Sequence, residues 1–210
     1  MYEINPETGN VVDLTIARAI QQGVVLAQQQ GYDVEGLSFI VKNPLKTYEY
    51  GASAAIIGDR QIGVVLDKEN PNYDTLTQLV VHEINHTERE KHSRIETLEE
   101  TLVSEGLAQK AEQVAGFASL PVSLFQSDED RNIAINSVKC RFNSLVLGDN
   151  RDPVKNYGYY FQGEGELKKY TGYALGLEIV TTYMDTTGAT IQEATQAPAS
   201  EIVSYWKNDI

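Results

Sequence analysis

The stretch His82-Glu83-Ile84-Asn85-His86 decides how this chain is expected to fold. Two histidines four residues apart on an α-helix project from one face, so both can bind the same metal ion. Glu83 lies beside them, where its carboxylate can take a proton from water held by that ion. The chain of 210 residues has three histidines, and two of them flank this glutamate. The pentapeptide therefore predicts a metal site on a helix.

The residues around the pentapeptide predict the helix that such a site needs. Apolar side chains recur at helical spacing between residues 75 and 91, which is typical of a half-buried helix. The start of this helix is marked by Pro71, Asn72 and Asp74, and by Thr75 with Gln78 three residues later, which has the form of a capping box. The alternative interpretation is a surface helix whose polar face carries two histidines and binds no metal.

Two histidines at this spacing favour zinc, and a zinc site needs a third protein ligand. His92 follows His82 by ten residues, the spacing at which metzincin proteases supply a third histidine. Those chains need a glycine for a sharp turn at the position where this chain has Arg89, a helix former. His92 is therefore the less favoured ligand, and its alternative role is a solvated histidine near a helix end.

Glu105 fits the third position better. Residues 93–96 have the form of a second capping box, so one helix is expected to end near His92. The next helix is then expected to span about residues 94–114. If the two helices fold back on each other, Glu105 comes level with both histidines at a rise of ~1.5 Å per residue.

The neighbours of Glu105 also favour it. They form an apolar stripe, on which an unpaired carboxylate would be costly to bury and a metal ion would compensate it. Gly106 and Ala108 are small enough to let the two helices approach closely. Three glutamates remain as competitors, namely Glu99, Glu100 and Glu112.

The stretch HEINHTER at residues 82–89, followed by TLEETLVSEGLAQ at 97–109, resembles the predicted zinc-dependent proteases of gluzincin type. The resemblance also includes YGASAAIIGDRQIGVVLD at 50–67 and YTGYALGLEIV at 170–180, and it spans roughly residues 35–205. It implies a zincin-like α+β fold, with a small N-terminal sheet and hairpin, the HExxH helix, and a mainly helical C-terminal lobe.

The resemblance also implies a set of site residues. It has Zn²⁺ held by His82, His86 and a glutamate on the next helix, here Glu105, with Glu83 as general base. Tyr173, in the segment that is similar to the family's C-terminal region, is the candidate to stabilise the oxyanion. A packing role is the alternative for Tyr173, because the chain has 12 tyrosines.

Composition limits the classes of partner. With 41% hydrophobic residues, the chain can bury a real core as one compact domain or as two lobes with a cleft between them. The resemblance implies that residues 1–210 form a single zincin-like catalytic domain. The expected lobes are about 1–92 and a helical part about 93–210. The net charge of −13 argues against nucleic acid or an anionic membrane as partner. The single cysteine, Cys140, cannot form an internal disulfide and is expected to be a small packing residue.

The chain has no apolar run long enough to predict a membrane span, and its first residues do not resemble a signal peptide. We therefore expect a cytoplasmic protein as the sequence is written, or an exported one whose signal has been trimmed. The sequence does not indicate an oligomeric state.

Other elements follow from periodicity and turn residues. A helix is expected at residues 11–30, a strand at 37–41, and two strands at 52–57 and 62–66 that form a hairpin. The hairpin would supply a sheet edge able to pair with an extended peptide, without indicating which of its strands is the edge. Further helices are expected at 171–184 and about 198–206. Residues 156–163, rich in tyrosine and glycine, suit either a loop beside a cleft or core anchoring.

These observations predict a zinc metallopeptidase that hydrolyses peptide bonds in a peptide or protein substrate. One alternative is a zincin-like protein that binds metal or peptide without turnover. Another is a zinc hydrolase of a non-peptide amide, and the last is a purely structural protein without metal.

Overall fold

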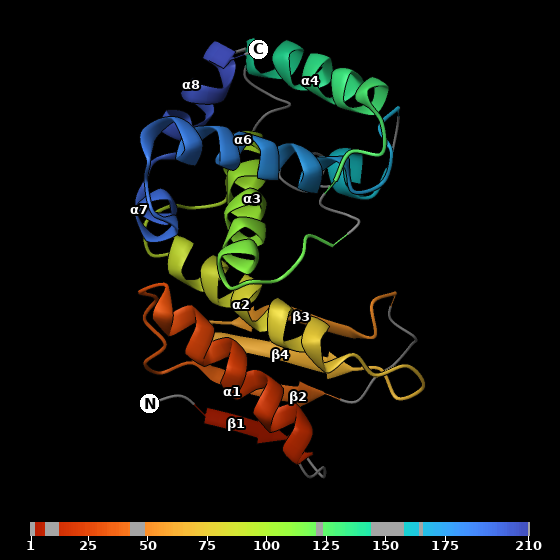
Figure 1. The fold of residues 1–210 in the computed structure, drawn as a ribbon, viewed down its shortest axis with the longest axis vertical. Coiled ribbons are helices and arrows are strands. Elements are labelled where there is room, and N and C mark those ends of the chain that lie inside the picture. Colours follow the sequence, from red (N-terminus) through yellow and green to blue (C-terminus); the bar gives the residue numbers. More distant parts are fainter. Residues whose placement is uncertain are drawn as a thin grey trace. The chain divides into compact units, whose positions relative to one another are not determined.

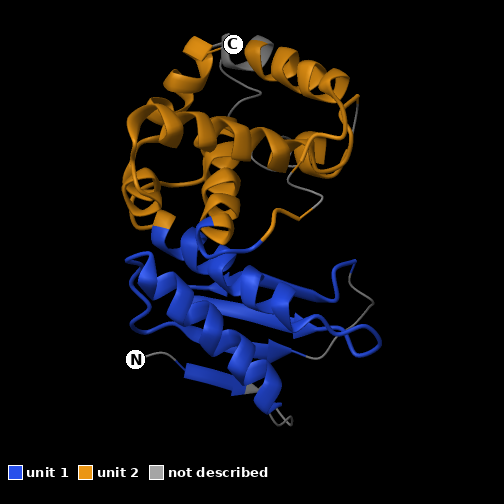
Figure 2. Cartoon of the chain, viewed as in Figure 1, with its two compact units in different colours: residues 1–88, 114–117 blue, residues 89–113, 118–210 orange. Residues whose placement is uncertain are grey.

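The computed structural model describes residues 3–6, 13–42, 49–120, 124–143, 158–163 and 166–209. The chain forms two compact units (Figure 2). Unit 1 consists of residues 1–88 with 114–117, and unit 2 of residues 89–113 with 118–210. The boundary between the units therefore falls inside the helix that carries the pentapeptide, whose last residue belongs to unit 2.

Unit 1 contains a mixed sheet, which has four strands within the described residues. The strands are β1 (Glu3–Pro6), β2 (Ser38–Lys42), β3 (Ala52–Gly58) and β4 (Gln61–Leu66), in the order β1-β2-β4-β3. β3 and β4 are antiparallel, which confirms the predicted hairpin, and β2 runs parallel to both β1 and β4. The order also identifies the hairpin strand at the sheet edge, which is β3.

Strand β1 was not predicted from the sequence. It has only four residues and ends in Pro6, so alternation of apolar and polar side chains has too little length to show. β1 is a strand because it pairs with β2, a contact between distant residues that the local sequence does not indicate.

Helices α1 (Leu14–Gln29) and α2 (Tyr73–Arg89) lie across one face of the sheet (Figure 1). The two helices touch at Gly23 of α1, where an added Cβ would lie 2.6 Å from Val80 Cγ1 and 2.9 Å from the Thr77 carbonyl oxygen. The Thr77 hydroxyl donates to the Ala19 carbonyl at 3.3 Å. These contacts hold the helix that carries the pentapeptide directly against α1.

The predicted capping box at Thr75 is wrong. Helix α2 begins two residues earlier, and the Asn72 side chain caps it by accepting from the Thr75 N–H at 3.0 Å. Thr75 and Gln78 are buried within the helix, 5% exposed each. Asn72, one of the residues that marked the helix start in the sequence, is therefore the cap.

Inside the pentapeptide, Asn85 anchors α2 rather than facing solvent. It is fully buried, and its Nδ2 donates to the Tyr32 hydroxyl oxygen at 2.8 Å. Tyr32 follows α1 and is itself 4% exposed. A buried amide needs such a partner, because leaving it without hydrogen bonds costs free energy.

Unit 2 is helical in its described part. Its main elements are α3 (Leu98–Val114), α4 (Asp128–Asn143), α6 (Thr171–Thr187), α7 (Ile191–Gln196) and α8 (Ala199–Asp209). The predicted helices at 171–184 and near 198–206 are confirmed as α6 and α8. The predicted second capping box is wrong, because Thr97 caps α3 by accepting from the Glu100 N–H at 3.1 Å.

Helices α3 and α6 cross with their backbones in close contact. A Cβ on Gly106 would lie 2.1 Å from the Gly176 carbonyl oxygen, and one on Gly176 would lie 2.3 Å from the Leu102 carbonyl oxygen. From the sequence, Gly106 is expected to allow close approach of the pentapeptide helix. In the structure, Gly106 instead allows close approach of α6. Gly176, like Gly106, therefore permits the close packing of the two helices.

The described part of the tyrosine- and glycine-rich stretch is a core anchor. Tyr160 and Phe161 are fully buried, and the Tyr160 hydroxyl lies 3.1 Å from Ser137 Oγ. Residues 156 and 157, which belong to the same stretch, lie outside the described residues, as does the side chain of Cys140. Packing rather than a cleft loop is therefore the role of Tyr160 and Phe161.

The small mixed sheet and the largely helical remainder confirm the α+β class. None of the helices in the described ranges has the length and apolar character needed to cross a membrane.

We predict that Gly106→Ala lowers the free energy of unfolding by about 3 kcal/mol, because the new methyl group meets backbone that cannot rotate away. Gly23→Ala serves as the comparison and should cost less, about 2 kcal/mol, because its contacts, 2.6 Å to Val80 Cγ1 and 2.9 Å to the Thr77 carbonyl oxygen, are longer than the 2.1 Å contact at Gly106. Urea unfolding followed by circular dichroism measures both. A Gly106→Ala protein stabilised by about 1 kcal/mol, as at an open helical position, would contradict the α3–α6 contact.

We also predict that Tyr32→Phe lowers the free energy of unfolding by roughly 1–3 kcal/mol, because Asn85 loses a buried hydrogen-bond partner. Tyr50→Phe is the matched control. The Tyr50 hydroxyl bonds to the exposed Glu49 at 3.2 Å, so its loss should change stability by less than about 0.5 kcal/mol. Equal effects of the two substitutions in urea unfolding would show that Asn85 is not anchored through Tyr32.

Candidate metal centre

Helix α2 brings the two histidines of the pentapeptide together. The Nε2 atoms of His82 and His86 lie 3.0 Å apart, and the two rings meet edge to face with centroids 4.7 Å apart. Each histidine is only 9% exposed. The ring nitrogens therefore point at a common location, as expected for two residues one helical turn apart.

Glu83 reaches from the same helix to the edge of the sheet. Its Oε2 accepts a hydrogen bond from the Ile56 N–H of β3 at 3.2 Å, and the residue is 8% exposed. The Thr87 hydroxyl donates to the Glu83 carbonyl at 2.9 Å. The carboxylate is thus fixed beside the edge strand, on the buried side of α2.

Glu105 lies in the middle of α3, the helix that follows α2 in the chain. One ligand atom from each of His82, His86 and Glu105 falls within 4.8 Å of the other two, so these three side chains could hold a metal ion. This group is the combination that the sequence favoured for a zinc site.

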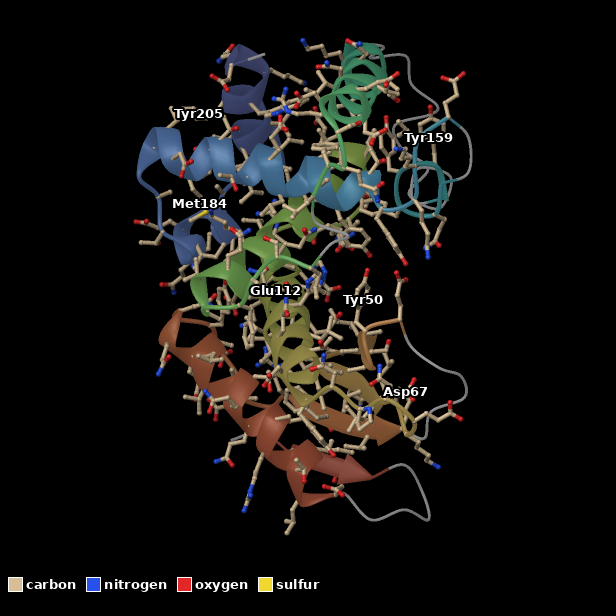
Figure 3. All side chains as sticks on the ribbon, turned by 45° about the vertical axis from the view of Figure 1, so that its right-hand side comes forward. Tyr50, Asp67, Glu112, Tyr159, Met184 and Tyr205 are labelled. Atoms are coloured by element: carbon tan, nitrogen blue, oxygen red, sulfur yellow. The ribbon has the colours of Figure 1, made fainter. Side chains whose placement is uncertain are left out.

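The competing candidates have other surroundings. His92 is exposed, and its N–H donates to the Arg89 carbonyl at 2.9 Å in the turn after α2. Glu99 pairs with Lys207 at 3.2 Å. Glu112 is buried at 3% exposure, two turns beyond Glu105 on α3 (Figure 3). The group of side chains that could hold a metal ion, His82, His86 and Glu105, contains none of these three competing candidates.

Glu100 has a partner that the sequence did not reveal. Its Oε1 accepts from Nε of Arg89 at 2.7 Å, and the two side chains are 6% and 0% exposed. From the sequence, Arg89 was used only to argue against a sharp turn before His92, and its burial was not predicted. The position of Arg89 on the inner face of the last turn of α2 could have indicated a buried ion pair, but the spacing of residues alone does not identify its partner.

Tyr173 lies in the first turn of α6 with its ring packed against other aromatics. The ring centroids of Phe161 and Tyr170 are 4.9 Å and 6.0 Å away. The Tyr173 carbonyl accepts from Gln109 Nε2 at 3.2 Å, which ties the start of α6 to α3 one turn after Glu105. These contacts establish its packing role and leave its catalytic role as a prediction.

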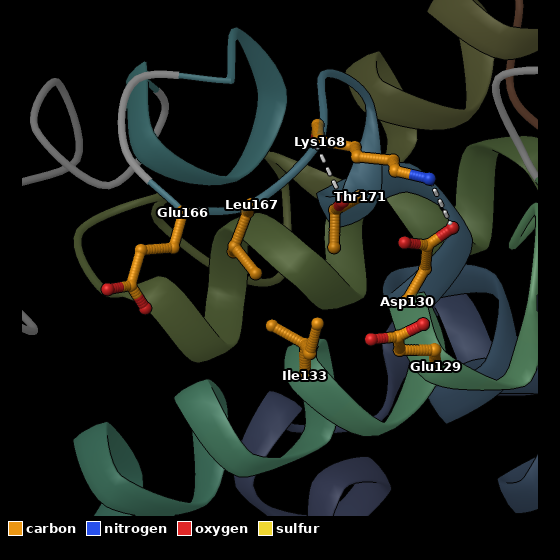
Figure 4. Close-up of a pocket in the computed structure, with 7 residues that line it drawn as sticks. All are labelled: Glu129, Asp130, Ile133, Glu166, Leu167, Lys168 and Thr171. Carbon is orange, nitrogen blue, oxygen red and sulfur yellow. Dashed lines mark hydrogen bonds and ion pairs between the residues drawn. The ribbon is translucent and has the colours of Figure 1, made fainter.

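A cavity of about 270 Å³ in unit 2 contains none of the predicted site residues (Figure 4). Lys168 and Asp130 form an ion pair of 2.9 Å in its wall. The hydrogen bond from Lys168 holds the pKa of the Asp130 carboxyl below its usual value. The remaining lining residues are Glu129, Ile133, Glu166, Leu167 and Thr171.

Comparison with known proteins gives two kinds of match. The chain is similar to a UPF0312 protein of Pectobacterium carotovorum subsp. carotovorum, with 27% identity over 153 residues, covering 70% of this chain and 76% of that protein. A UPF0312 protein of Pectobacterium atrosepticum matches with the same identity and coverage. The names of these two relatives state no activity.

The second match concerns a protein family and spans most of the chain. Residues 13–204 match the family described as "Predicted Zn-dependent protease (DUF2268)". This range contains the whole of α2 and α3, with both histidines and both glutamates of the candidate centre. The chain therefore belongs to the DUF2268 family of predicted Zn-dependent proteases.

Proposed function

We propose that this protein is a gluzincin-like zinc metallopeptidase of zincin-like fold, in which His82, His86 and Glu105 hold Zn²⁺ and Glu83 acts as general base. The observation that carries the proposal is the approach of one ligand atom from each of the three residues to within 4.8 Å of the others. Membership of a family described as predicted zinc-dependent proteases supports it.

The donor atoms fit zinc. Two imidazole nitrogens and one carboxylate oxygen are a ligand set of catalytic zinc sites, which leave a fourth position open. Nitrogens at ~2.0–2.1 Å from a tetrahedral ion lie about 3.3 Å apart. The 3.0 Å between the Nε2 atoms of His82 and His86 is close to that separation. Zinc, when bound there, would activate water and polarise the substrate carbonyl.

The protein side chains would do the proton transfer. Glu83, next to His82 on α2, takes a proton from the attacking water and later delivers it to the leaving amine. The hydrogen bond from the Ile56 N–H orients its carboxylate. A base held in one place by a backbone donor loses little freedom when the substrate arrives.

The edge strand β3 supports a peptide as substrate. Since β4 occupies the interior of the sheet, β3 presents one side of its backbone for pairing with an extended chain. Ile56, whose N–H binds Glu83, belongs to this strand, so a peptide paired with β3 would run beside the general base. The family description points to the same class of substrate.

Tyr173 is the residue that we assign to the oxyanion. A tyrosine hydroxyl can donate a hydrogen bond to the oxygen that gains charge during attack on a peptide carbonyl. Packing against Phe161 at 4.9 Å and the bond from Gln109 to its carbonyl restrict the position of Tyr173, as a preorganised donor requires.

The metal content of purified variants tests the ligand set. We predict about one zinc ion per wild-type chain, lost with Glu105→Ala and kept with the matched control His92→Ala. Inductively coupled plasma mass spectrometry measures it after dialysis against dilute zinc. Loss with His92→Ala and retention with Glu105→Ala would replace the proposed ligand set, and no metal in any protein would refute the zinc site.

Hydrolysis of a mixed casein substrate tests the role of Glu83. We predict that Glu83→Gln retains zinc and lowers the rate at least ~100-fold, because the proton acceptor is gone. Glu88→Gln, on the same helix and also buried, should keep about the wild-type rate. A chelator should abolish the wild-type activity.

Two outcomes of that assay would contradict the proposal. Full activity of zinc-loaded Glu83→Gln would remove Glu83 from the mechanism. A wild-type protein that binds zinc but cleaves no peptide would favour a non-catalytic binding protein or a hydrolase of non-peptide amides.

A further inference from the structure

Arg89 is a charged residue outside the proposed ligand set that is fully buried. It is the last residue of α2. An arginine side chain keeps its charge in folded proteins, so burying it is tolerated only when charged and polar partners surround it. The proposed reaction does not use this residue, and its position raises the question of what the buried charge does.

The guanidinium group of Arg89 joins three helices. Its Nε donates to Glu100 on α3 at 2.7 Å. Its Nη1 donates to the carbonyl oxygens of Thr195 at 2.7 Å and Ala197 at 2.5 Å, at the end of α7. The last carbonyls of a helix lack partners within that helix, so a cation there both completes hydrogen bonds and meets the negative end of the helix dipole.

This connection lies close to the proposed ligands along both helices. His86 precedes Arg89 by three residues on α2, a rise of about 4.5 Å. Glu105 follows Glu100 by five residues on α3, a rise of about 7.5 Å. The ion pair therefore fixes the last turn of α2 to α3 beside the segments that carry His86 and Glu105.

The affinity of the site for zinc depends on how firmly the ligand-bearing helices are held. Its ligand distances vary by only about 0.2 Å between well-formed sites, so a small rotation or slide of one ligand-bearing helix weakens binding. Arginine suits this role better than lysine, because its planar fork can hold the carboxylate and the carbonyls simultaneously, whereas an ammonium is a point charge on a flexible chain.

We infer that Arg89 is a positioning residue of the metal centre: through Glu100 and the end of α7 it holds the pentapeptide helix in the orientation that zinc binding requires. This inference rests on the proposed zinc site. It goes beyond it by assigning zinc affinity to a buried ion pair that touches neither metal nor substrate, and by connecting α7 to the site.

The test compares zinc affinity with folding stability in the full chain. The variants are Arg89→Lys and the milder Glu100→Gln, which keeps the shape of the side chain and removes its charge. Trp206→Leu is the control, because Trp206 is a fully buried residue of α8 in the same unit whose indole bonds to Glu178. Competition with a chromophoric chelator gives the zinc Kd, and urea unfolding of the metal-free protein gives stability.

We expect Arg89→Lys and Glu100→Gln to fold and to raise the zinc Kd by about 10–100-fold. This is the usual loss of affinity when a group that orients a metal ligand is removed. Trp206→Leu, destabilised at least as much, should stay within about threefold of the wild-type Kd. If Arg89→Lys fails to fold, Glu100→Gln decides between the outcomes.

Zinc affinity in folded Glu100→Gln and Arg89→Lys equal to that of the wild type would overturn the inference while leaving the proposed function in place. So would an equal loss of affinity in Trp206→Leu, because affinity would then only follow stability. A wild-type chain that binds no zinc would refute the proposed function, and the inference with it.

Discussion

Helix α2 buries polar side chains along most of its length, and the rest of the structure depends on how their hydrogen-bonding needs are met. Residues from Thr75 to Arg89 that are at most 9% exposed include both histidines, Glu83 and Asn85. Each such group would destabilise the fold if it were desolvated without a partner. The partners come from α1, from the loop after α1, from β3 and from α3 and α7. A helix bound at so many polar points has little freedom to rotate, which is the property that a two-histidine metal site requires.

The same principle explains which parts of the fold could be predicted from the sequence. The β3–β4 hairpin and helix α6 have local signals, a turn between two apolar runs and a helical pattern of side chains, and both were predicted. Both predicted capping boxes were wrong, because such residue pairs also occur away from helix starts. Thr75 lies inside α2, which Asn72 caps, and Ser93 lies before α3, which Thr97 caps. Strand β1 and helix α7 are too short for periodicity to show. Helix α7 does have a local signal that the sequence analysis did not use, a capping box formed by Thr190 and Glu193.

The candidate site divides in the same way. The spacing of His82 and His86 places two proposed ligands on one face of a helix, so these two ligands could be predicted from the sequence. Glu105 required a guess about how two helices fold back, and three other glutamates competed with it. The partners of Arg89 could not be found, because Thr195 and Ala197 lie more than a hundred residues away in the chain. Burial of a charge is settled by tertiary structure, which no local pattern reports.

X-ray absorption spectroscopy of the zinc-loaded wild-type protein is the sharpest test of a zinc centre on α2 and α3, because it counts the atoms bound to the metal and measures their distances. We expect a four-coordinate ion with two imidazole nitrogens and two oxygens at ~2.0–2.1 Å, one oxygen from Glu105 and one from water. A spectrum with three imidazoles would move the third ligand to His92. A fully hydrated ion with no imidazole scattering would contradict a zinc centre on helices α2 and α3.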